Sequence, residues 1–141
     1  MKFLVLGGCA DMAMPLLKRL HEDDAVSGVM LADLDEAKAK RLAEAYGGKF
    51  TGIFCDATDA PCVVSLMRGY DVAVCYVGPF YRFERALAAC AIEAGVHYVS
   101  IADDYDAYLD VITLDEAARQ AGVKILSGFG NSPGITQVLA A

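Results

Sequence analysis

The residues best suited to chemistry form a short turn near the N-terminus, followed at a distance by an acidic residue. Gly8, Ala10 and Ala13 fit the pattern G-x-G-x-x-G/A, with alanine at the second and third places. In that pattern the first residue makes a tight turn, the second lets the backbone approach a pyrophosphate, and the third packs a helix on a strand. Asp33 follows on the next apolar run, where a carboxylate hydrogen-bonds a ribose hydroxyl. The spacing therefore predicts a dinucleotide site.

The residues around the turn and Asp33 indicate which dinucleotide fits. Leu34 follows Asp33, and no arginine stands beside them to receive a 2′-phosphate. A phosphate at that point would face a like charge, so the sequence favours NAD over NADP. Asp11 and Met12 lie in the first turn of the next helix. A carboxylate there suits the helix dipole but repels phosphate, so we expect Asp11 to point outward. The alternative for Asp33 is a solvated loop acid or a helix N-cap.

Two further loops come after later strands and converge on the same region. Asp56 and Ala57 follow the third strand, where an adenine edge would rest, and Gly78 and Pro79 follow the fourth, beside a nicotinamide ribose. Ligands of open α/β sheets bind beyond the carboxyl ends of the strands, so these loops should line one crevice. Polar residues nearby could bind or protonate a substrate, but a polar loop and a helix N-terminus are the favoured explanation for them. They are Tyr81, Asp103, Asp104 and Tyr105.

Short apolar runs alternate with helical segments along almost the whole chain, and this alternation must position the residues above. The runs predict strands at 3–6, 29–32, 50–55, 72–77, 98–101 and 124–126, and helices at 10–21, 36–46, 59–68, 83–94 and 108–121. Gly95 and Gly122 end two of these helices. Six strands with right-handed helical crossovers predict a Rossmann-like, doubly wound parallel sheet in a three-layer α/β/α arrangement.

Composition excludes several classes of function. A formal charge of −7 disfavours binding to nucleic acid or to an anionic membrane surface. No apolar run reaches the roughly 18 residues that span a bilayer. The five cysteines include no C-x-x-C pair, and two histidines do not complete a zinc site, so we expect no metal. Reduced, mostly buried cysteines are typical of a cytoplasmic protein.

Three stretches, at 77–80, 89–99 and 132–136, resemble the NAD(P)-binding domain of the saccharopine dehydrogenase family, and the similarity runs along all 141 residues. The resemblance implies an oxidoreductase that transfers hydride between NAD(P) and an amino-acid-derived amine or imine. Saccharopine-forming members tend to carry an aspartate at Ser132, and many relatives carry an acid at Ser100, so saccharopine itself is not the expected substrate. With the two loop neighbours Asp11 and Leu34 added, the expected cofactor-binding residues are Gly8, Ala10, Asp11, Met12, Ala13, Asp33, Leu34, Asp56, Ala57, Gly78 and Pro79.

The resemblance also implies a domain organisation. Residues 1–141 would form the dinucleotide-binding domain at the N-terminus of a longer protein, with the substrate domain absent and this part inactive alone. We expect a small amino-acid-like substrate and a possible homodimer. The alternative is a nucleotide-sensing Rossmann module that regulates without catalysis, and a third interpretation is a dimerisation domain that binds no nucleotide. The sequence identifies neither the substrate nor the catalytic residues.

Overall fold

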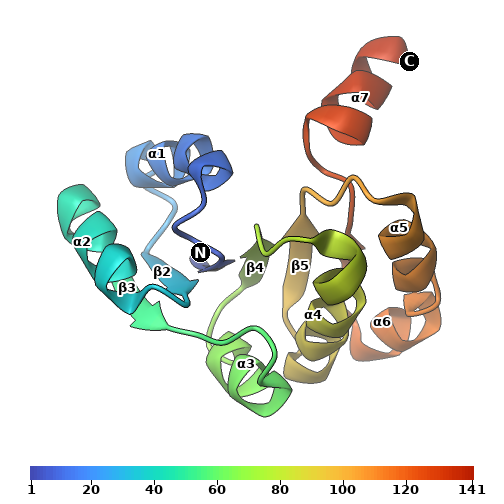
Figure 1. Cartoon of the computed structure of the whole chain (residues 1–141), viewed down its shortest axis with the longest axis horizontal. Coiled ribbons are helices and arrows are strands. Elements are labelled where there is room, and N and C mark those ends of the chain that lie inside the picture. Colours follow the sequence, from blue (N-terminus) through green and yellow to red (C-terminus); the bar gives the residue numbers. More distant parts are fainter.

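Short apolar runs form the strands of one parallel sheet, as expected of strands that are covered on both faces (Figure 1). The computed structural model describes residues 1–141. The strand order is β3-β2-β1-β4-β5-β6, so the chain reverses direction across the sheet between β1 and β4. This confirms the doubly wound arrangement. The strands are β1 (Lys2–Leu6), β2 (Gly28–Asp33), β3 (Phe50–Phe54), β4 (Val72–Cys75), β5 (His97–Ser100) and β6 (Ile125–Leu126).

The helices connect the strands and cover the two faces of the sheet. No helix combines the length and the apolar character that crossing a bilayer requires. The last helix projects from the sheet and has no buried residue (Figure 1). The helical segments are η1 (Asp11–Ala13), α1 (Met14–Glu22), α2 (Glu36–Tyr46), α3 (Ala60–Met67), α4 (Phe80–Ala94), α5 (Tyr105–Ile112), α6 (Asp115–Ala121), the irregular turn η2 (Asn131–Ile135) and α7 (Thr136–Ala140).

Alternating side chains of the central strand enter two separate cores. Leu4 and Leu6 of β1 belong to the core formed with α3, α4 and α5. Val5, between them, belongs to the core formed with α1 and α2. This alternation follows from the two-residue period of a strand. The first two crossover helices therefore cover one face, and the later helices cover the other.

Two helices differ from the sequence expectation for local reasons. The first α-helix begins at Met14 rather than near residue 10, because Pro15 fits only the first turn of a helix. A 3-10 turn precedes it. The segment expected as one helix at 108–121 is two helices that end and restart around Thr113. The Thr113 hydroxyl donates to the carbonyl of Asp110 at 2.6 Å, so the side chain competes with the backbone there. The predicted glycine stops at Gly95 and Gly122 both adopt left-handed conformations.

Gly52 of β3 lets α2 lie against the sheet. A Cβ atom placed on Gly52 would lie 2.4 Å from the carbonyl carbon of Ala39 and 2.5 Å from the nitrogen of Lys40. Both atoms belong to the backbone of α2, so neither can move without moving the helix. The missing side chain at Gly52 thus sets the position of α2, which carries part of the cleft described below.

We predict that Gly52→Ala lowers the free energy of unfolding by about 3 kcal/mol, because the added methyl must displace helix backbone. Gly28→Ala in the neighbouring strand is the control, since its Cβ would meet only the Lys2 side chain at 3.6 Å. We expect that control to change stability by less than about 1 kcal/mol. Urea titration followed by circular dichroism measures the free energy of unfolding of both variants. Equal losses of stability in the two would contradict the contact between Gly52 and the backbone of α2.

Candidate functional site

The loop after β1 turns sharply at Gly7. This residue adopts a left-handed conformation with φ of +67°, and its N–H donates to the carbonyl of Ala32 at 2.9 Å. A Cβ atom here would lie 3.0 Å from the carbonyl carbon of Tyr76 on β4's following loop. Glycine is therefore required both by the conformation and by the close approach of another backbone. The sequence placed the tight turn at Gly8, and the structure corrects this by one residue.

Gly8 allows the loop to pack against the next strand instead. A Cβ atom on Gly8 would lie 3.1 Å from the Cβ of Leu31 and 3.1 Å from the carbonyl oxygen of Val5. Ala13 is fully buried beneath the loop, in the place where helix packs on strand. Ala10 follows in extended conformation just before the 3-10 turn and faces the cleft.

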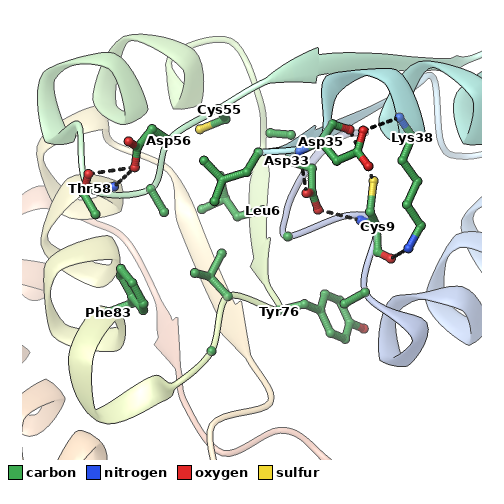
Figure 2. Close-up of a pocket in the computed structure, with 17 residues that line it drawn as sticks. Leu6, Cys9, Asp33, Asp35, Lys38, Cys55, Asp56, Thr58, Tyr76 and Phe83 are labelled. Atoms are coloured by element: carbon green, nitrogen blue, oxygen red, sulfur yellow. Dashed lines mark hydrogen bonds between the residues drawn. The ribbon is translucent and has the colours of Figure 1, made fainter.

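Asp33 ends β2 with its carboxylate held by two backbone N–H groups. The N–H of Cys9 donates to Oδ2 at 2.9 Å, and the N–H of Asp35 donates to Oδ1 at 3.1 Å. Figure 2 shows the carboxylate lying against the loop after β1. Each oxygen retains acceptor capacity, so the fixed carboxylate can still receive hydroxyl donors from a ligand.

Lys38 of α2 also reaches this loop, and the sequence analysis did not anticipate it. Its ammonium donates to the carbonyl of Cys9 at 2.9 Å (Figure 2). Asp35 caps α2 by accepting from the Lys38 N–H at 2.8 Å, which places Lys38 in the first turn of the helix. That N-cap is the signal that could have identified it, because a first-turn side chain lies near the preceding strand end. A cation therefore lies close to Asp33 even though no arginine follows it in the sequence.

The Cys9 thiol lies at the same corner and is not activated. Burial raises its pKa to about 11, and the nearby Asp33 carboxylate adds to the shift. At neutral pH the thiol is protonated, so it is a poor nucleophile. Its sulfur lies 4.0 Å from the Asp35 carbonyl, within reach of a weak S–H hydrogen bond.

The loop after β3 forms the opposite wall. The backbone N–H and the hydroxyl of Thr58 donate to Oδ1 of Asp56 at 2.8 and 2.7 Å. These hydrogen bonds lower the pKa of Asp56, the hydroxyl contributing most. Figure 2 places this pair across the cleft from Asp33, with Phe83 of α4 below it.

Together these segments line a cleft of about 450 Å³ at the carboxyl ends of β1 to β4. The expected residues that line it are Ala10, Asp33, Leu34, Asp56, Ala57 and Gly78. The expected residues outside its lining are Gly8, Asp11, Met12, Ala13 and Pro79; Met12 is 64% exposed, and Asp11 lines a neighbouring hollow. Gly7, Cys9 and Thr58 of the same loops also line it, and the sequence analysis missed Lys38, Tyr76 and Phe83.

A second cavity of about 690 Å³ lies beyond β5 and β6. Asp104 lines it and accepts the N–H of Tyr81 at 3.0 Å, which ties the loop after β5 to the start of α4. The lining includes two carboxylates and no lysine or arginine. Its residues are Ala102, Asp103, Asp104, Tyr105, Tyr108, Gly128, Ser132, Pro133 and Gln137.

Three solved structures share this fold. A saccharopine dehydrogenase (L-Glu forming) from Saccharomyces cerevisiae matches with a TM-score of 0.85 and 24% identity, over 99% of this chain and 29% of that one. The 3-ketoreductase KijD10 from Actinomadura kijaniata matches with a TM-score of 0.70 and 21% identity, over 99% and 41%. A Gfo/Idh/MocA family oxidoreductase from Vibrio cholerae matches with a TM-score of 0.68 and 20% identity, over 92% and 38%. The chain thus spans less than half the length of each.

The family comparison covers most of the sequence. The model of the saccharopine dehydrogenase NADP binding domain matches residues 3–126, from the start of β1 to the end of β6. The matched region includes every residue that lines the cleft. It follows that the chain belongs to the family of saccharopine dehydrogenase NADP binding domains, and that it is a Rossmann-like domain of the NAD(P)-binding type.

Proposed function

We propose that the cleft binds NAD and that the protein acts in hydride transfer to or from an amino-acid-derived amine or imine. The observation that carries this proposal is the fixed Asp33 carboxylate beside the glycine turn. When bound, the nicotinamide ring accepts or donates the hydride, and the chain binds and orients it.

The residues of the cleft fit a dinucleotide. Gly7 and Gly8 carry no side chains, so the first part of the loop lets a pyrophosphate approach the backbone. Asp33 suits the ribose hydroxyls, which donate hydrogen bonds to a carboxylate. The wall formed by Ala57 and Thr58 would border the adenine. The polar groups of the cleft therefore match the adenosine part of a dinucleotide that binds at the carboxyl ends of β1 to β3.

The choice between NAD and NADP depends on two opposite charges. A 2′-phosphate on the ribose would be repelled by Asp33 and attracted by Lys38. Asp33 is oriented by two backbone donors, whereas the Lys38 ammonium already donates to the Cys9 carbonyl. We therefore expect Asp33 to have the larger influence on the choice of cofactor. Lys38 reduces the preference for NAD over NADP.

We predict that the protein binds NAD at least about tenfold more tightly than NADP, because one carboxylate–phosphate repulsion exceeds the offset from Lys38. Asp33→Asn should reduce the difference between the NAD and NADP affinities by strengthening NADP binding. Lys38→Met should increase this difference. Isothermal titration calorimetry with both cofactors measures these changes. Equal or tighter binding of NADP by the wild type would refute the preference for NAD.

The cavity beyond β5 supports the amine or imine part of the proposal. Its two carboxylates, Asp103 and Asp104, have no cationic partner within the lining. Such a surface attracts a protonated amine. The phenols of Tyr105 and Tyr108 add hydrogen-bonding groups that could orient the substrate.

We predict NADH formation by the protein with secondary amines derived from amino acids, in a spectrophotometric assay over a substrate panel. Asp104→Asn should raise KM for the amine about tenfold, since the cavity loses one attracting charge. Asp110→Asn, an exposed position of α5 outside the cavity, is the matched control and should leave KM unchanged. Turnover of alcohols alone would contradict the amine assignment, and cofactor binding without any turnover would favour a sensing module.

A further inference from the structure

Glu84 of α4 is a fully buried carboxylate that receives three hydroxyl groups. The Tyr98 hydroxyl donates to Oε2 at 2.9 Å, and the Ser127 hydroxyl donates to Oε1 at 2.8 Å. The Ser100 hydroxyl also donates to Oε1. None of the three ion pairs in the structure involves Glu84. The carboxylate is therefore stabilised by neutral dipoles and not by a cation.

The hydrogen bonds around Glu84 match an ionised carboxylate. Burial raises the pKa of Tyr98 well above its ordinary value, with nearby Cys75 and Glu84 adding to the shift, so the phenol remains a donor. The Ala102 N–H donates to the Ser100 hydroxyl oxygen at 3.4 Å. Because that oxygen accepts from Ala102, its own hydrogen can point at Glu84. Both carboxylate oxygens act as acceptors. With hydroxyl donors on both oxygens, the side chain fits a carboxylate anion, a negative charge that solvent would screen weakly inside the protein.

This charge lies at the carboxyl edge of one half of the sheet. Ser100 ends β5, in register with Cys75 at the end of β4, and Ser127 directly follows β6. In doubly wound folds each half of the sheet binds one mononucleotide. Because Asp33 belongs to the half formed by β1 to β3, the nicotinamide belongs over β4 to β6. The three hydroxyl groups that bond Glu84 come from this half of the sheet.

We propose that Glu84 sets the relative affinity for the two redox forms of the cofactor and favours the oxidised one. This inference rests on the proposed NAD site. The nicotinamide ring of NAD⁺ carries a positive charge, and that of NADH is neutral, while the adenosine and pyrophosphate parts are the same. A buried negative charge therefore attracts one form and leaves the other almost unaffected. Since the attraction acts through space, it requires no contact between Glu84 and the ring.

The test is the dissociation constant of NAD⁺, NADH and ADP-ribose for the wild type and for Glu84→Gln. The wild type should bind NAD⁺ more tightly than NADH. The amide keeps the size of the side chain and removes its charge, so NAD⁺ binding should weaken roughly tenfold. Binding of NADH and of ADP-ribose, which lack the ring charge, should stay within about twofold.

Ser127→Ala is the matched control, because it removes one donor and leaves Oε1 bonded to Ser100. In this variant the ratio of the NADH and NAD⁺ dissociation constants should equal that of the wild type. An unchanged ratio in Glu84→Gln with intact ADP-ribose binding would overturn the inference. If that variant does not fold, tighter binding of NADH than of NAD⁺ by the wild type would overturn it. Failure of the wild type to bind ADP-ribose would refute the proposed nucleotide site, and this inference with it.

Discussion

The hydrogen bond from the Cys9 N–H to Asp33 joins the two features on which the cleft depends. One is the turn after β1, and the other is the end of β2. The Gly7 N–H already ties the loop to the Ala32 carbonyl, and the bond to Asp33 adds the carboxylate itself to this junction. Lys38 strengthens the same junction by donating to the Cys9 carbonyl from α2. The backbone of Cys9 is thus held at two atoms. Its N–H donates to Asp33, and its carbonyl oxygen accepts from Lys38.

The sequence predicted the order and type of nearly all elements, because apolar runs and glycine stops are local signals. Asp59 caps the start of α3, and Gly95 ends α4 as expected. The errors at the cleft concern interactions between distant segments. The tight turn falls on Gly7 because the Tyr76 backbone passes close to it, and no local pattern reveals that approach. Lys38 enters the cleft only because α2 packs closely on β3.

The two halves of the sheet carry their charges in different ways. On the side of β1 to β3, Asp33 and Lys38 lie beside the cleft and contact backbone groups. On the side of β4 to β6, Glu84 is fully buried and bonded to hydroxyl groups. Replacing one exposed charge changes a local contact, whereas a buried charge affects the potential over a wider region. Sequence reasoning missed Glu84 because a glutamate on an amphipathic helix is usually solvated.

The short last strand has a consequence for how the domain opens. β6 has two residues and pairs only with β5, so few backbone hydrogen bonds hold this edge. Beyond it, the Phe129 N–H donates to the Ser100 carbonyl at 2.8 Å, and Ser127 bonds Glu84. Thermal fluctuations should release this edge well before the central strands, as a separate cooperative unit. The C-terminal segment would then unfold locally while the half formed by β1 to β3 stays intact, so the domain would consist of a rigid half and a labile one.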